Sequence, residues 1–219
     1  MESYRLLCPY CGYDLKVMPQ RKKKCPSCAQ PIYSKYTPEN RTKRLMTEKE
    51  AQKTEQMWSS YNVRQTSISV LYPFGYDESD VEKERARGAK TDQEAIVSLM
   101  NHVIATEKNL HKLKMAYFIL ANQAAELGKD TFRRFLIAAH YCELYRYKQQ
   151  GGVIKKVQIA ASGLKNLCPE CQSKEGRILD IDEALKTMPL PCRTCTCTRF
   201  DGIVGFCGCN YLPYKEGWT

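Results

Sequence analysis

The chain has 219 residues, of which 43% are hydrophobic and 26% charged, with 12 cysteines and a formal net charge of +10. No run of 18 apolar residues occurs, and no apolar core follows the first residues, which argues against a membrane-spanning helix and a secretory signal peptide. We therefore expect a cytoplasmic protein with no membrane partner. In that reducing compartment, clustered cysteines hold metal more often than they form disulfides.

The positive charge is concentrated at the start of the chain. Residues 1–64 carry 13 basic and 6 acidic side chains, a net charge of +7, whereas residues 65–150 carry +1 and residues 151–219 carry +2. A zinc ion bound by four thiolates is a centre of net charge −2, so metal binding makes the protein less basic. The excess over the first segment predicts an anionic partner there.

Two C-x2-C pairs lie thirteen residues apart near the N-terminus, Cys8 with Cys11 and Cys25 with Cys28. Each pair presents two sulfurs from one tight turn, and two turns complete the tetrahedral shell that zinc prefers. Gly12 suits the positive φ that such a turn needs. Short strands at 13–17, 21–24 and 31–33 would complete a zinc ribbon that folds on its metal. Two disulfides or free thiols are the alternative.

A basic run joins the two cysteine pairs, and further cations follow it, with Tyr33 and Tyr36 interleaved. The run is either a solvated hairpin tip or a patch that contacts phosphate. We favour the patch and expect nucleic-acid contacts from Arg21, Lys22, Lys23, Lys24, Lys35, Arg41, Lys43 and Arg44. Zinc ribbons also bind proteins, so a protein partner stays open.

The middle of the chain is predicted to be mainly helical. Thr47 and Glu50 form a capping box that opens a helix to about Ser59, 66–71 alternates like a short strand, and 72–90 is a polar loop or linker. A second capping box at Thr91 opens a long helix over 91–127, unless it breaks in two. Its apolar stripe indicates a bundle contact or self-association: Ile96, Leu99, Val103, Thr106, Leu110, Leu113, Tyr117, Leu120, Ala124 and Leu127.

Gly128 is expected to end that helix, Asp130 to cap another over 131–149, and a strand to follow over 153–160. Cys142 and the three histidines, His102, His111 and His140, are expected to be packed or surface residues of helices, not ligands. Asp180 and Asp182 resemble a catalytic carboxylate pair, but the simpler interpretation is that Asp182 caps a helix over 183–186. The sequence therefore favours a protein that is not an enzyme.

A second cysteine cluster lies near the C-terminus, with seven members: Cys168, Cys171, Cys192, Cys195, Cys197, Cys207 and Cys209. Seven are too many for one four-thiolate site and one short of two separate sites. The simplest assignment is one zinc on the first two and two of the later five, with Cys195 and either Cys207 or Cys209 favoured. A second zinc with a shared or non-cysteine ligand is the alternative. We thus expect Zn²⁺ at two places, one at each end of the chain.

The stretch from Val153 to Cys209 contains a strand, Cys168-Pro169-Glu170-Cys171, a strand over 176–179, an acidic turn, a proline-rich turn and a final C-x-C. It resembles the C-terminal module of phage head-morphogenesis (minor head) proteins. Those proteins place a helical region before it, and a histidine usually precedes their last cysteines. Here Gly205-Phe206 stands at that place. The resemblance implies a phage or mobile-element origin and phage structural proteins as partners.

We therefore expect an α+β chain with a central helical bundle, a β zinc ribbon at the N-terminus and a cysteine-rich zinc-binding β module at the C-terminus. The expected domains are residues 1–37, 38–90, 91–150 and 151–219, the second being a helix with a polar linker. The favoured function is nonenzymatic zinc-dependent nucleic-acid binding. The alternatives are a phage head-morphogenesis or other adaptor protein, and an enzyme that uses an open metal site.

Overall fold

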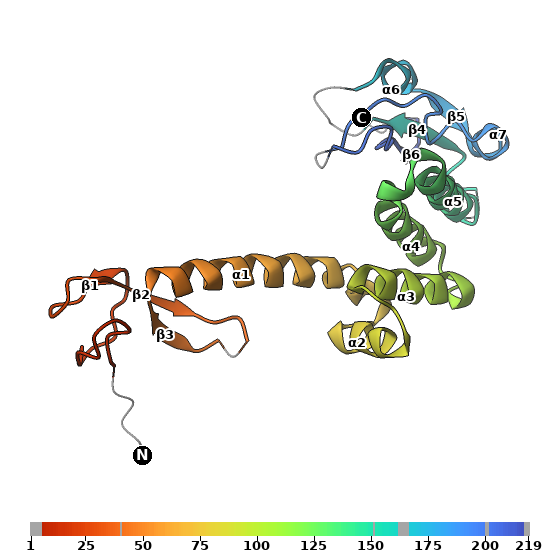
Figure 1. Ribbon diagram of the computed structural model, residues 1–219. Helices are drawn as coiled ribbons and strands as arrows, with labels where there is room; N and C mark the ends of the chain where they lie inside the picture. The colour runs from red at the N-terminus through yellow and green to blue at the C-terminus, as the bar shows by residue number, and fades with distance from the viewer. Residues whose placement is uncertain (1–5, 40, 151, 162–166, 200–201, 217–219) are drawn as a thin grey trace. The chain divides into compact units, whose positions relative to one another are not determined.

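The computed structural model describes residues 6–39, 41–150, 152–161, 167–199 and 202–216. The chain divides into two compact units, residues 1–69 and residues 70–219, which are described separately below. Over the described residues it has seven α-helices and two three-stranded antiparallel sheets, labelled in Figure 1. The predicted α+β class is confirmed. None of the described helices combines the length and the apolar character that crossing a membrane requires.

The first unit contains a sheet and one long helix. Its strands are β1 (Lys23–Lys24), β2 (Pro31–Tyr36) and β3 (Lys43–Met46), in the order β1-β2-β3. The predicted strand at 31–33 is confirmed and extends further, because 43–46 supplies a partner that the sequence did not reveal. The strand expected at 13–17 is reduced to one bridge between Leu7 and Asp14.

Helix α1 (Glu48–Ser69) begins at the predicted capping box. The Glu50 carboxylate accepts hydrogen bonds from the backbone N–H and the hydroxyl of Thr47, both at 2.8 Å. The helix continues well past Ser59, and the strand expected at 66–71 was wrong. Thr66 donates its hydroxyl hydrogen to the carbonyl of Asn62 within the helix, and Ile68 is fully buried. Burial therefore outweighs the weak strand preference of β-branched residues.

The second unit starts with a short 3₁₀ turn, η1 (Tyr72–Phe74), and helix α2 (Glu78–Arg87). The loop predicted over 72–90 was therefore wrong for this part. Asp77 and Asp80 form a reciprocal capping box, and Val81 is the one buried residue of α2. A highly charged helix that buries a single side chain shows no apolar stripe, which explains why it was missed.

The long helix predicted over 91–127 is broken into α3 (Asp92–Thr106) and α4 (Leu110–Gln123), followed by the 3₁₀ turn η2 (Ala125–Leu127). Thr91 caps α3 as predicted, by accepting from the N–H of Glu94. The break occurs because Asn109 caps a new helix and accepts from the N–H groups of His111 and Lys112. Leu127, at the end of the predicted stripe, is 74% exposed.

Helix α5 (Lys129–Lys148) packs along α4 and carries the C-terminal module. Its N-cap position is Gly128, so Asp130 lies in the first turn and does not cap it. The module has strands β4 (Lys156–Ala160), β5 (Ile178–Asp180) and β6 (Asn210–Tyr214), in the order β5-β4-β6, and helices α6 (Pro169–Lys174) and α7 (Ile181–Thr187). The strand predicted from 153 begins at Lys156. Helix α7 begins before Asp182, whose carboxylate accepts from Lys148 at 2.6 Å, so Asp182 is not its cap.

Candidate metal centres

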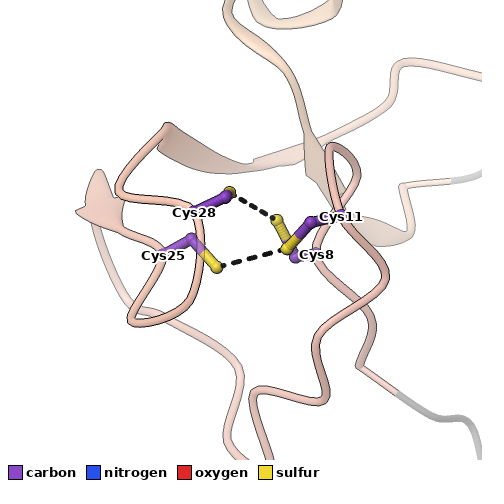
Figure 2. A group of neighbouring side chains, drawn as sticks. All are labelled: Cys8, Cys11, Cys25 and Cys28. Atoms are coloured by element: carbon purple, nitrogen blue, oxygen red, sulfur yellow. Dashed lines mark hydrogen bonds between the residues drawn. The ribbon is translucent and has the colours of Figure 1, made fainter.

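The four N-terminal cysteines converge from two turns of the same shape (Figure 2). The backbone N–H of Gly12 donates to the carbonyl of Cys8, and that of Ala29 donates to Cys25, each at 2.9 Å. Both residues after a pair are left-handed, with φ of 74° at Gly12 and 58° at Ala29. The positive φ predicted for Gly12 is confirmed. The second turn reaches the same geometry with an alanine, at a conformational cost of about 1 kcal/mol.

The sulfur spacing of this group fits a tetrahedral ion. The Sγ atoms of Cys8 and Cys28 are 3.8 Å apart, and those of Cys11 and Cys25 are 3.7 Å apart (Figure 2). Four sulfurs at about 2.3 Å from one zinc ion would be separated by about 3.8 Å. A disulfide needs about 2.05 Å, and all twelve cysteines are free. The group can therefore hold a metal ion, and the spacing does not fit the disulfide alternative.

The backbone also prepares a thiolate in this group. Burial raises the pKa of the Cys25 thiol, but hydrogen bonds from the N–H groups of Cys28 and Ser27 outweigh it and lower that pKa to about 7. The pKa of Cys28 moves the other way, to about 12, because the hydrogen bond from the N–H of Gln30, which lowers it, is outweighed by burial and the neighbouring sulfurs. Because the thiolate is the form that binds metal, the lowered pKa favours a metal ligand at Cys25. The surrounding apolar contacts are few, with Ile32 fully buried and Leu15 and Leu45 packed beside it.

The seven C-terminal cysteines form two groups of four that share one member. The first group is Cys168, Cys171, Cys195 and Cys197, and the second is Cys171, Cys192, Cys207 and Cys209. All seven are buried. The structure thus brings Cys195 to Cys168 and Cys171, as the sequence favoured. The fourth member of that group is Cys197, whereas Cys207 and Cys209 belong to the second group.

Several hydrogen bonds stabilise this cluster. The N–H of Cys168 donates to the sulfur of Cys197, and the N–H of Cys192 donates to the sulfur of Cys207, each at 3.3 Å. From α5, Arg133 donates to the carbonyls of Pro191 and Cys192 at 2.9 and 2.8 Å. The loop that carries Cys192 is therefore fixed against α5. Such bonds orient metal ligands, and their loss usually weakens metal binding.

The loop is also held from α6. The Glu170 carboxylate, which lies between Cys168 and Cys171 in sequence, accepts from the backbone N–H groups of Arg193 and Thr194 at 3.0 and 2.5 Å. Sequence reasoning missed the supporting roles of Arg133 and Glu170. Glu170 stands inside a C-x2-C turn, which is the one signal that could have drawn attention to it.

The predicted nucleic-acid-binding residues lie in the first unit with different environments. The side chains of residues 21–24, Arg41 and Arg44 are exposed, whereas Lys35 and Lys43 are half-buried. Lys35 forms an ion pair with Glu55 of α1, which reduces its availability to a phosphate. Lys22 lies over the ring of Tyr33, 4.9 Å from its centroid.

A groove between the β2–β3 turn and α1 adds residues that the sequence did not suggest. It is lined by Arg41 and Glu39 from the turn and by Lys53, Met57 and Tyr61 from α1. Lys53, Met57 and Tyr61 recur every four residues, so the periodicity of α1 could have placed them on one face. The groove combines two cations with an aromatic ring and one carboxylate.

The remaining candidate residues, His140 and Cys142, are packed inside the fold. His140 is fully buried, and its ring packs edge-to-face against Phe118 and Tyr211. Cys142 is buried and lies outside the three cysteine groups. Over the part of the chain that the structure describes, those groups contain neither histidine nor carboxylate.

Comparisons with protein-family models, with curated proteins and with solved structures give no match.

Proposed function

We propose that this protein is a nonenzymatic zinc-binding protein that binds nucleic acid through the basic surface of its first unit. The observation that carries the proposal is the run of four exposed cations at 21–24, which lies between the two metal-binding turns. None of the four forms an ion pair with another described residue. Exposed cations without an ion-pair partner suit a polyanion, because each phosphate contact releases counterions from the nucleic acid.

The charge of the two units supports this placement. Residues 1–69 carry 13 basic and 6 acidic side chains, a net charge of +7, and residues 70–219 carry +3. A zinc ion on Cys8, Cys11, Cys25 and Cys28 lowers the first value to +5, with the cations still exposed. Thiolate-only zinc sites with four protein ligands are closed to substrate, which favours a structural role for the metal.

The groove beside α1 provides a place for a base. Arg41 and Lys53 can contact phosphates, while the ring of Tyr61 offers a stacking surface. Such contacts are sequence-tolerant, so the proposal is binding without strong sequence preference.

The test is a fourfold charge reversal, Arg21→Glu, Lys22→Glu, Lys23→Glu and Lys24→Glu, assayed by fluorescence anisotropy with labelled DNA and RNA. If all four cations contact phosphates of duplex DNA, they contribute about −3.6 to the slope of log affinity against log salt. They would then account for an affinity loss of about 150-fold between 50 and 200 mM salt. The variant should bind weakly and show a flatter salt dependence.

A matched control separates a local surface from net charge. Lys155, Arg177, Lys186 and Lys215 are exposed residues of the second unit with the same composition, one arginine and three lysines. Their reversal changes the net charge equally and should leave binding within about threefold, as expected for charges outside the interface. Equal losses in both variants, or no loss in either, would refute the proposed surface. Absence of binding in the wild type at low salt would instead favour an adaptor that binds protein, the role that the phage resemblance suggests.

A further inference from the structure

The C-terminal module contains more clustered cysteines than one metal ion can bind. The two groups of four contain seven different residues, because Cys171 belongs to both. Within each group the four Sγ atoms lie within 4.8 Å of one another. An ion in the first group alone would leave Cys192, Cys207 and Cys209 as three buried thiols at metal-binding distance.

The position of the Cys171 sulfur fits a shared ligand. It lies 3.8 Å from the sulfur of Cys195 and 3.9 Å from that of Cys197, both in the first group. It also lies 4.0 Å from the sulfur of Cys207, in the second group. These distances are close to the edge of about 3.8 Å expected for a zinc–sulfur tetrahedron. Cys171 is 1% exposed, so both neighbouring sites are closed to solvent at this point.

We infer that the C-terminal module holds two zinc ions bridged by the thiolate of Cys171. Each ion has four sulfur ligands: the first takes Cys168, Cys195 and Cys197 with the bridge, and the second takes Cys192, Cys207 and Cys209 with the same bridge. The inference depends on the metal-binding part of the proposed function and is independent of nucleic-acid binding.

Sharing a thiolate also suits a buried site electrostatically. Two separate four-thiolate sites would carry a total charge of −4, whereas seven thiolates and two zinc ions carry −3. The N–H groups of Cys168 and Cys192 donate to sulfur within the cluster, and Lys129 donates to the carbonyl of Cys195 at 3.1 Å. These donors offset part of the remaining negative charge, which burial would otherwise make costly. The net charge of residues 70–219 would fall from +3 to zero.

The first experiment counts metal in the purified full-length protein by elemental analysis. The wild type should contain three zinc ions per chain, one for each cysteine group. The variant Cys8→Ser/Cys11→Ser removes the N-terminal site and should retain two. Cys142→Ala changes the cysteine outside the groups and should retain three. A total of two in the wild type with one left in the N-terminal variant, or iron and sulfide in place of zinc, would overturn the inference.

The second experiment tests the bridge itself and needs no variant of the module. Replacement of zinc by ¹¹³Cd should give two thiolate-type NMR signals from the C-terminal module that are coupled to each other through the shared sulfur. Two signals with no mutual coupling would contradict a bridge.

Ligand variants add a graded test: Cys171→Ser should lose both ions, whereas Cys197→Ser and Cys209→Ser should each lose one. These outcomes do not depend on nucleic acid, so this inference and the proposed binding surface can fail separately.

Discussion

Arg133 offers a test of how the fold supports the second C-terminal cysteine group. Its guanidinium donates three hydrogen bonds from α5 to the loop, at 2.9 Å to Pro191, 2.8 Å to Cys192 and 3.2 Å to Arg193. Only the bonds to Pro191 and Cys192 are part-buried. A hydrogen bond from a charged donor contributes about 1.5–3 kcal/mol, and partial exposure places these two bonds near the lower end of that range. We therefore expect Arg133→Met to reduce the free energy of unfolding by roughly 2–4 kcal/mol.

The same variant should weaken the metal site that contains Cys192. Loss of a group that orients a ligand lowers metal affinity by about 10–100-fold. A competition titration with a chromophoric chelator should therefore show one zinc ion per chain released more easily, while the N-terminal ion is retained as in the wild type.

Arg134 provides the control for this experiment, because it is the next residue on α5, its side chain is exposed, and that side chain makes no hydrogen bond or ion pair with another described residue. Arg134→Met should match the wild type in stability and in zinc release. If Arg133→Met and Arg134→Met behave alike, the hydrogen bonds from α5 to the loop do not support the metal site.

Three further predictions concern stability. Glu143→Gln removes the buried carboxylate that accepts hydrogen bonds from Lys114 and Arg146. The free energy of unfolding in urea should fall by about 2–3 kcal/mol, which is less than for a fully buried ion pair because both cations are part-exposed. A change below about 0.5 kcal/mol would contradict this. Burial lowers the pKa of His140 to about 4, with the Cys207 thiolate opposing this shift and Lys114 adding to it. The contribution of His140 to the free energy of unfolding is therefore present above pH 6.5 and is lost as the pH falls toward 4. From pH 7.5 to 5.5 the wild type should lose about 1.3 kcal/mol more than His140→Phe, and parallel pH profiles of the two proteins would refute this. Cys25→Ser should abolish the hydrogen-exchange protection of the N-terminal turns, because bound metal supplies the folding energy of so small a module. Helices α4 and α5 should stay protected. Retained protection of the turns would show that they fold without metal.

The structure shows which features short-range patterns could predict. The N-terminal metal-binding group could be predicted because each turn places two ligands three residues apart, so the spacing alone specifies the local geometry. The capping boxes at Thr47 and Thr91 could be predicted for the same reason. The helix break at Asn109 was missed because the apolar stripe continues across it, although asparagine is a strong helix cap.

The division of the C-terminal cysteines depends on tertiary contacts. Cys192 and Cys197 are close in sequence yet belong to different groups, because Cys192 lies on the part of the loop bound by Arg133 of α5. Nothing in the spacing of the later five cysteines indicates that assignment. The odd total of seven did indicate a shared ligand as an alternative, and the structure identifies Cys171 as the residue that two groups have in common.

We propose that metal-bound turns present a basic surface to nucleic acid, and one comparison separates that surface from the effect of net charge. Binding of labelled single- and double-stranded DNA and RNA is measured for the zinc-loaded wild type and for Cys25→Ser. Loss of the N-terminal zinc makes the first unit more positive, by two charges, because neutral thiols replace a centre of charge −2. The proposed surface predicts salt-sensitive binding by the wild type and weaker binding by the variant, since the cations of the variant no longer share a fixed surface. Equal or tighter binding by the variant, or no binding by the wild type at 50 mM salt, would contradict it.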